Sequence, residues 1–142
     1  MAYDNDNIFA KILRGEQSAF TVYENDHCLS FMDVMPQSDG HTLVIPKTSA
    51  ENIFDLPPEA ARELIVAVQH VARGVRAAFQ PEGIRLQQFN GPVAGQSVFH
   101  IHMHIVPCYE KKSLLGHSGK MAPTDTLERH AKMLRDALAE LD

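Results

Sequence analysis

The 142-residue sequence predicts an α+β fold, in which an antiparallel sheet of about five strands carries two main helices and a short N-terminal helix. Short segments with β-branched and aromatic residues, bounded by Gly, Pro, Asn or Asp, recur along the chain and indicate strands. Two longer segments repeat apolar residues at intervals of three and four, which is typical of amphipathic helices. The length and the lack of internal repeats favour a single domain over residues 1–142.

The first half of the chain predicts one short helix and three strands. A helix over about residues 7–14 ends at Gly15, a common stop signal. A hairpin follows, because Asn25 and Asp26 form a turn signal between two strand-like segments. The three strands are expected at residues 20–24, 28–34 and 42–46.

The second half predicts the two main helices. The first extends over about residues 58–79, where Leu64, Val68 and Val75 belong to one apolar face, and Pro81 and Gly83 end it. The second begins at about residue 125 and places Leu127, Ala131, Leu134, Leu138 and Leu141 on one face. Two further strands are expected at residues 84–89 and 98–106, and a loop at 109–123.

A row of alternating histidines is the most informative motif. His100, His102 and His104 alternate with apolar residues inside the predicted strand 98–106. Side chains on a strand alternate between faces, so the three imidazoles would share one face with Cα atoms about 6.5–7 Å apart. Burying three imidazoles without partners is costly, so an ordinary amphipathic strand does not explain the row. Histidine at neutral pH serves either nucleophilic and proton-transfer chemistry or metal binding, and both alternatives stand.

The loop before the row has the composition of a phosphate site. Gly91 and Gly95 allow the backbone to approach a ligand closely. Such a loop can present backbone N–H groups, and Gln96 and Ser97 add polar side chains at the strand entrance. The loop and the row together indicate a phosphate held beside an imidazole.

Three sequence blocks resemble the histidine-triad (HIT) family. Residues 95–107 fit the family pattern of Gly-Gln-Ser/Thr followed by three histidines that alternate with apolar residues. Residues 31–47 and 7–16 match two other family blocks in the right order, so the resemblance covers roughly residues 5–108. It implies a homodimer formed by joining two sheets, and no cofactor.

The resemblance implies a role for each histidine of the motif. His102 is similar to the family nucleophile, which attacks the α-phosphorus of a nucleotide and forms a covalent nucleotidyl-histidine. His100 would orient that nucleophile, and His41 would support the triad from a neighbouring strand. His104, Gln96 and Ser97 would contact phosphate oxygens or assist the leaving group.

The remaining binding residues carried over from the resemblance each have a structural alternative. Asp33 would accept hydrogen bonds from ribose hydroxyls, but Asp also favours turns. His41 alternatively lies on a polar strand surface, and Asn90, near the phosphate in the family, alternatively shapes the turn with Gly91. Apolar side chains would sandwich the base, and the first two of them also suit a helix core: Ile8, Phe9 and Val34.

The implied activity is hydrolysis of a purine nucleoside phosphoramidate or a dinucleoside polyphosphate, with release of a nucleoside monophosphate such as AMP. Gln96-Ser97 resembles the phosphoramidase branch, whereas residues 91–96 resemble the fragile-histidine-triad branch, so the substrate stays open. A nucleotide-binding or scaffolding protein with little turnover is the main alternative. A metal protein that uses the histidine row is another, although three adjacent ligands on one flat strand reach a single ion poorly.

No metal is expected at the N-terminus. Some bacterial relatives bind structural zinc through a Cys-x-x-Cys motif, and this chain has Asn7 and Ala10 at those positions. Those relatives also have a histidine just after a Pro-Lys pair, where this chain has Thr48 and Ser49.

Composition limits the kinds of binding partner and the cellular compartment that we expect for this protein. The formal net charge of −5 gives no basic patch for nucleic acid, and no apolar run approaches the roughly 18 residues of a membrane span. The polar start of the chain is unlike a signal peptide, and the two lone cysteines, Cys28 and Cys108, are typical of a reducing cytoplasm. The loop 109–123 is either an ordinary charged, mobile loop or a segment that meets a polyphosphate or a leaving group through Lys111, Lys112, His117 and Lys120.

Overall fold

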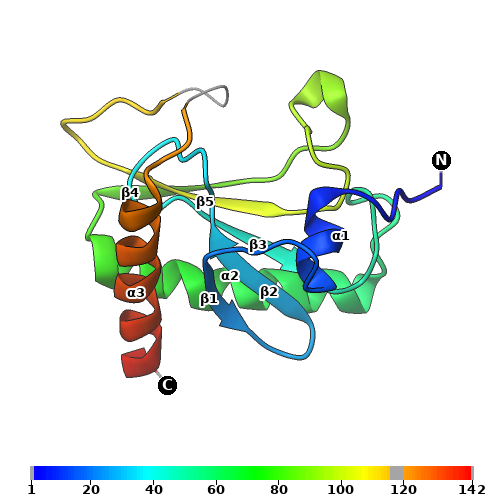
Figure 1. Ribbon diagram of the computed structural model, residues 1–142, viewed down its shortest axis with the longest axis horizontal. Helices are drawn as coiled ribbons and strands as arrows, with labels where there is room; N and C mark the ends of the chain where they lie inside the picture. The colour runs from blue at the N-terminus through cyan, green and yellow to red at the C-terminus, as the bar shows by residue number, and fades with distance from the viewer. Residues whose placement is uncertain (1, 116–119, 142) are drawn as a thin grey trace.

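The computed structural model describes residues 2–115 and 120–141 and confirms the α+β prediction (Figure 1). Its five-stranded sheet has the order β1-β2-β3-β5-β4, and every neighbouring pair is antiparallel. The strands are β1 (Thr21–Glu24), β2 (Cys28–Met32), β3 (Thr42–Pro46), β4 (Gly83–Gln87) and β5 (Met103–Cys108). The helices are α1 (Ile8–Leu13), α2 (Pro58–Phe79), α3 (Thr124–Leu141) and the short 3₁₀ helix η1 (Pro92–Ala94).

The two faces of the sheet carry different layers. The long helices α2 and α3 cover one face, and their apolar residues pack with Met32, Val44 and Ile105 in the larger core. The short helix α1 lies on the other face, in front of the sheet in Figure 1, where Phe9 packs with Phe31 and the neighbouring apolar residues of β2 and β3. Because strand side chains alternate, His104 points to the α1 face while Ile105 points to the long helices.

The helix predictions are accurate to one residue. α2 has the predicted bounds and ends at Phe79; Gln80 follows as the C-cap with a left-handed backbone (φ 50°), and its N–H donates to the Arg76 carbonyl. α1 begins one residue later than predicted, because Asn7 is its N-cap and accepts a hydrogen bond from the Ala10 N–H. α3 begins at Thr124, one residue before the predicted start.

The strand that was predicted at 98–106 is wrong in its bounds. β5 begins only at Met103, so His100 and His102 precede the strand and only His104 lies on it. The preceding segment runs past the end of β3: the Ile101 N–H donates to the Ala50 carbonyl instead of joining a strand ladder. A local alternation of residues indicates an extended chain, but pairing with a neighbour decides where a strand begins.

The bounds of the other strands differ from the predicted ones by at most two residues. β2 ends at Met32, before the predicted residue 34, because the Asp33 carboxylate accepts a hydrogen bond from the Met35 N–H and turns the chain. β4 ends at Gln87, before the predicted residue 89, at the residue that pairs with His104. β1 begins at Thr21, and β3 has the predicted bounds. In the part of the chain that the structure describes, neither long helix has both the length and the apolarity to cross a membrane.

Candidate active site

Four histidines gather where β3 and β5 meet on the α1 face. His104 lies on β5 opposite Leu43, and His41 immediately precedes β3. His41 and His100 are fully buried, and His102 and His104 are 7% and 5% exposed. Buried imidazoles need hydrogen-bond partners, and these partners decide which ring nitrogen of each histidine carries the proton.

His102 is held by the backbone. Its Nδ1 lies 2.8 Å from the carbonyl oxygen of His100. A carbonyl only accepts, so Nδ1–H donates, and in the neutral ring Nε2 is unprotonated. The Phe9 ring packs edge-on against this imidazole with a centroid distance of 4.9 Å. The ring therefore has one orientation and presents a basic nitrogen.

His100 is held through both ring nitrogens. Its Nε2–H donates to the Pro46 carbonyl at the end of β3, at 2.8 Å. Its Nδ1 therefore accepts, and the Tyr3 hydroxyl donates to it at 2.5 Å. Burial lowers the pKa of His100, with an opposing contribution from the hydrogen bond to Pro46, so this ring is neutral at pH 7.

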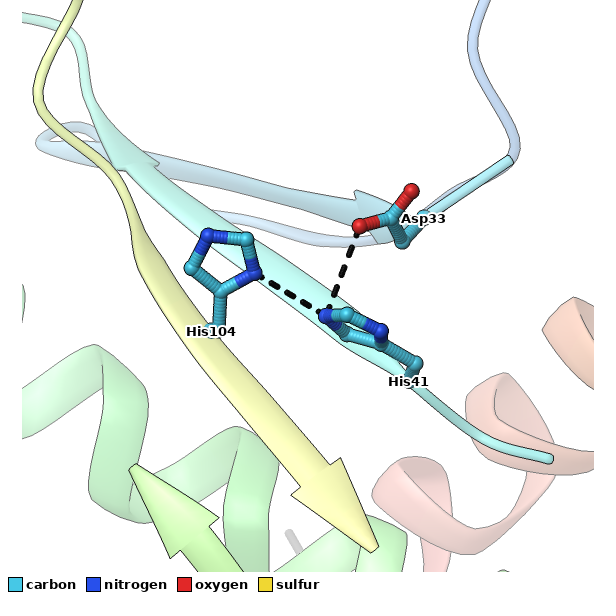
Figure 2. A group of neighbouring side chains, drawn as sticks. All are labelled: Asp33, His41 and His104. Atoms are coloured by element: carbon cyan, nitrogen blue, oxygen red, sulfur yellow. Dashed lines mark hydrogen bonds and ion pairs between the residues drawn. The ribbon is translucent and has the colours of Figure 1, made fainter. Parts of the chain in front are cut away.

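His41 and His104 form a second hydrogen-bonded pair (Figure 2). The Gln37 N–H donates to His41 Nδ1 at 3.0 Å, so the proton of the neutral His41 ring is on Nε2. This Nε2 lies 3.0 Å from His104 Nδ1 and donates to it. His104 consequently carries its own proton on Nε2. Phe89 packs against the His104 ring with a centroid distance of 5.4 Å.

Asp33 makes the turn that was considered for it and also contacts His41. One carboxylate oxygen makes the turn with Met35, and the other lies 3.4 Å from His41 Nε2 (Figure 2). The Asp33 side chain keeps 17% of its surface exposed, whereas His41 keeps none. The turn thus holds a carboxylate at the entrance of the histidine cluster.

The same three side chains have the spacing of metal ligands. Within residues 2–115 and 120–141, Asp33, His41 and His104 are the single group of at least three candidate ligands whose donor atoms lie within 4.8 Å of one another. A metal-bound histidine usually donates through its other ring nitrogen. Here the other nitrogen of His41 accepts the Gln37 N–H, so this hydrogen bond opposes a metal on Nε2. The contacts favour a chain of hydrogen bonds over a metal centre.

The glycine loop has the expected backbone shape but uses its donors internally. Gly91 (φ 97°) and Gly95 (φ 106°) adopt conformations that favour glycine. The N–H groups of residues 94–96 donate to carbonyls of residues 91 and 92. The Gln96 side chain is buried, accepts from the Gly91 N–H and donates to the carbonyls of Glu51 and Val98. Gln96 therefore shapes the loop.

Ser97 and Ile8 border an open pocket between the N-terminal segment and the glycine loop. Both are exposed, and they line a pocket of about 500 Å³ together with Asn7, Glu51 and other residues of the N-terminal segment and the glycine loop. Phe9 is buried in the smaller core, as its helix-core alternative expects, and its ring also contacts His102. Val34 packs against the larger core, whereas Phe9 belongs to the smaller one.

Asn90 anchors the loop to the segment after β3. Its carboxamide oxygen accepts from the Ile53 N–H at 2.9 Å, and its amide exchanges hydrogen bonds with Gln88. These contacts involve Ile53 and Gln88 and tie the two segments together.

The segment after β5 is tied to the same region as His41. The Leu115 N–H and carbonyl pair with the backbone carbonyl and side-chain amide of Gln37, and Lys112 lies 3.8 Å from the Asp39 carboxylate. His117 lies outside the described residues.

Sequence reasoning missed three residues that touch the cluster. Tyr3 and Phe89 contact His100 and His104, and the Gln37 backbone fixes His41. The only sequence signal for Tyr3 is an aromatic residue in an otherwise polar N-terminal stretch, and Gln37 acts through its backbone, which no side-chain pattern reveals.

The fold and this arrangement of histidines define a histidine-triad protein, and comparison with known proteins agrees. The model of the HIT domain family matches residues 14–111. The chain therefore belongs to the HIT domain family.

Relatives and solved structures match most of the chain. It is 47% identical over 104 residues to Protein hit of Bacillus subtilis (strain 168), covering 73% of this chain and 72% of that protein. It is 33% identical over 137 residues to Adenylylsulfatase HINT3 of Arabidopsis thaliana, covering 96% of this chain and 66% of that protein. The crystal structure of a Hit-like protein involved in cell-cycle regulation from Bartonella henselae aligns with a TM-score of 0.89 and 46% identity, covering 96% and 99% of the two chains.

Proposed function

We propose that this protein is a nucleotide hydrolase that cleaves the α-phosphate bond of purine nucleoside phosphoramidates or dinucleoside polyphosphates. The observation that carries the proposal is the backbone-held His102, whose Nδ1–H donates to the His100 carbonyl and whose Nε2 is the basic nitrogen. A neutral imidazole attacks phosphorus without first losing a proton, and burial keeps the adjacent His100 neutral at pH 7.

The proposed reaction has two displacement steps. In the first, His102 Nε2 forms a bond to the α-phosphorus, and the bond from phosphorus to the leaving group breaks with its electron pair on the leaving group. In the second, water attacks the phosphorus and gives its proton to the group that protonated the leaving group, the P–N bond breaks with its electron pair on His102 Nε2, and the nucleoside monophosphate leaves. His104 carries a proton on Nε2 and is held by His41, so it is suited to hydrogen-bond a phosphate oxygen or to supply a proton to the leaving group.

The proposed binding roles follow the same geometry. Asp33 accepts the ribose hydroxyls, and Ile8 and Phe9 flank the base from α1. Ser97 is exposed, lines the pocket next to the glycine loop and contacts a phosphate oxygen or the leaving group in this proposal. Gln96, Gly95 and Asn90 act by shaping the loop that borders the phosphate.

The decisive experiment measures AMP release from adenosine 5′-phosphoramidate by the wild type and by His102→Ala, with and without a chelator. We expect release by the wild type in both conditions and a loss of roughly 10⁴-fold or more in the variant, as for other removed nucleophiles. The relative named adenylylsulfatase makes adenylyl sulfate a useful second substrate, and a diadenosine polyphosphate tests the other branch.

Matched controls separate the possible outcomes. His27 is exposed on the surface and lies 3.8 Å from Glu63, so His27→Ala is expected to keep full activity. Intact-protein mass spectrometry after a rapid quench should detect one nucleotidyl group on the wild type and none on His102→Ala. Activity that disappears with chelator contradicts the metal-independent reaction. Nucleotide binding without release of AMP from any of the substrates supports a binding or scaffolding role instead.

We further propose a homodimer formed through β4. This edge strand is mostly exposed, and Leu86 on it is 48% exposed. On α2, Ile65 and Val66 are 52% and 60% exposed, and together with Leu86 they line a groove of about 710 Å³. Pairing with the β4 of a second copy would continue the sheet and cover this apolar surface. Light scattering should give a dimer mass for the wild type and a monomer mass for Val66→Glu; a monomeric wild type would contradict the proposal.

A cytoplasmic location is the last part of this proposal. Both described cysteines are unpaired, and burial raises the pKa of Cys28 to about 11, so this thiol is poorly reactive. Free thiols are typical of a reducing compartment. Fractionation of cells followed by immunodetection tests the location, and recovery outside the cytoplasm would contradict it.

A further inference from the structure

The segment before α1 reaches the centre of the histidine cluster through one side chain. We propose that Tyr3 is a positioning residue of the active site, which acts through His100 to aim His102 at the substrate. The kinetic part of this inference rests on the proposed hydrolase function, whereas the structural part does not.

The contact between Tyr3 and His100 is specific in geometry. The Tyr3 hydroxyl lies 2.5 Å from His100 Nδ1, and the two rings meet edge to face with a centroid distance of 5.7 Å and an interplanar angle of 71°. His100 is fully buried, and Tyr3 is partly buried. Residues 97 positions apart in the sequence thus share a short hydrogen bond at an interior site.

The N-terminal segment that carries Tyr3 is fastened to α1. The Asp4 carbonyl accepts from both the N–H and the side-chain amide of Asn7, the N-cap residue of α1. The Asn5 carbonyl accepts from the Arg14 guanidinium at 2.8 Å, and Glu16 pairs with the same guanidinium. Two independent attachments therefore hold the backbone on the C-terminal side of Tyr3.

The hydroxyl supplies what His100 Nδ1 requires. The Pro46 carbonyl accepts a hydrogen bond from Nε2–H, so the neutral ring has an acceptor at Nδ1 and needs a donor there. An apolar side chain in place of Tyr3 would leave a buried acceptor without a partner, which favours a turned ring or the other tautomer. Either change would release the hydrogen bond to Pro46.

The position of His100 affects the orientation of the His102 ring through one hydrogen bond, which the His100 carbonyl accepts. The His100 side chain fixes its own residue to the end of β3, and the His100 carbonyl accepts from His102 Nδ1 at 2.8 Å. The segment before β5 has no strand pairing at His100 to hold it, so these side-chain contacts and the Ile101 N–H to Ala50 hydrogen bond set its position. A shifted His100 carbonyl would turn the His102 ring and move Nε2 away from the phosphorus.

The test compares Tyr3→Phe with the wild type by two measurements. The first is ¹⁵N NMR of the histidine rings, which distinguishes protonated from unprotonated ring nitrogens without any substrate. In the wild type we expect His100 to be protonated on Nε2, with its Nδ1 signal displaced by a hydrogen bond. In Tyr3→Phe we expect the His100 Nδ1 signal to lose that displacement and the His102 signals to shift.

The second measurement is steady-state AMP release at equal concentrations of folded protein. Because Tyr3 fixes the orientation of the His102 ring, we expect the kcat of Tyr3→Phe to be roughly tenfold lower than that of the wild type, which corresponds to about 1.4 kcal/mol. KM should stay within about twofold, since uniform binding of substrate is unchanged. A purely structural role for Tyr3 would lower the amount of folded protein and leave kcat per folded molecule and the His102 signals unchanged.

Tyr23→Phe is the matched control. Tyr23 is also partly buried, accepts a hydrogen bond from Asn25 and packs against a histidine, His70, with a centroid distance of 4.9 Å. This variant should keep both the kcat and the His100 signals of the wild type.

Each remaining outcome has a definite meaning. A His100 ring protonated on Nδ1 in the wild type, or a Tyr3→Phe variant with unchanged His102 signals and unchanged kcat, overturns the inference. If the wild type releases no AMP from any of the substrates while its His100 and His102 signals respond to Tyr3→Phe, the proposed hydrolase function fails and the coupling from Tyr3 to His102 stands.

Discussion

The two faces of the sheet carry different kinds of side-chain contact. On the face covered by α2 and α3, apolar side chains pack against one another, and Val44, Val68 and Leu134 are fully buried there. On the face that carries α1, a smaller apolar cluster stands beside four histidines held by hydrogen bonds to the backbone, to Tyr3 and to each other.

The difference shows how one small domain separates stability from chemistry. Apolar burial is non-directional and tolerates small shifts, whereas the histidines need fixed protons and fixed ring orientations. The larger apolar cluster lies on the face covered by α2 and α3, so we expect that face to contribute more to the free energy of folding. The α1 face places directional contacts where a pocket stays open to solvent. Substitutions on the two faces should consequently separate stability from activity, and four predictions test this separation.

The largest expected effect is on the covered face. Leu134→Ala on α3 should lower the free energy of unfolding by about 2–5 kcal/mol, because it leaves a cavity in a fully buried site. AMP release per folded molecule should be unchanged. Urea denaturation measures the first quantity, and Leu141→Ala, at a 47% exposed position of the same helix, is the control. A loss of kcat in folded Leu134→Ala would show that the two faces are coupled.

Next in size is a substitution on the α1 face. His41→Asn removes the donor that holds His104 Nδ1 and should lower kcat by roughly 10²-fold, a usual size for a disturbed acid–base group. His27→Asn, at an exposed position, should retain wild-type kcat. The comparison between the faces breaks down if His41→Asn loses stability but keeps the kcat of the wild type.

The third prediction concerns the pH dependence of the free energy of unfolding, to which one buried histidine on each side of the sheet contributes. Burial is the main cause that lowers the pKa of both His100 and His130 on α3 below the ordinary value of 6.5. The unfolded chain therefore takes up protons first as the pH falls. The free energy of unfolding should be constant above about pH 6.5 and decrease below it, by at most about 1.4 kcal/mol per pH unit for each histidine.

Urea denaturation between pH 5 and pH 8 measures this dependence. His130→Gln and His100→Gln should each reduce the slope below pH 6.5, and only His100→Gln should also reduce AMP release. A slope that neither substitution changes would assign the pH dependence to other groups.

The smallest expected effect is on the solvent side of α3. Lys132 and Asp136 form an ion pair at 2.7 Å with spacing i, i+4, and both side chains are mostly exposed. Lys132→Ala should change the free energy of unfolding by no more than about 0.5 kcal/mol, because water and salt screen such a pair. A thermal melt in low and high salt measures it, and a larger effect that disappears in salt would show a stronger surface network than the contacts indicate.

Much of the fold could be predicted from local patterns. The bounds of α2 and β3 are as predicted, and five antiparallel strands form the sheet. These elements depend on periodicity and on turn or stop residues within a few positions of each other. The strand over 98–106 was misjudged because alternation extends beyond the residues that find a partner strand.

The candidate site was predicted in its residue types more than in its contacts. The motif named His41, His100, His102 and His104, and the structure brings them together. It did not show that Gln96 uses its amide inside the loop, or that Val34 packs on the opposite core from Phe9. Such assignments depend on which face of a turn a side chain takes, and residue types alone do not determine that.

The sequence by itself determined the class of fold, the long helices and the histidine motif, because each of these is expressed in residues close together along the chain. Only the tertiary structure decided the state of the histidines. The donors and acceptors that place each proton are the Tyr3 hydroxyl, the Gln37 N–H and the Pro46 carbonyl. They come from segments far from the row in sequence, and a hydrogen bond depends on distance and direction in space, which only the folded chain defines.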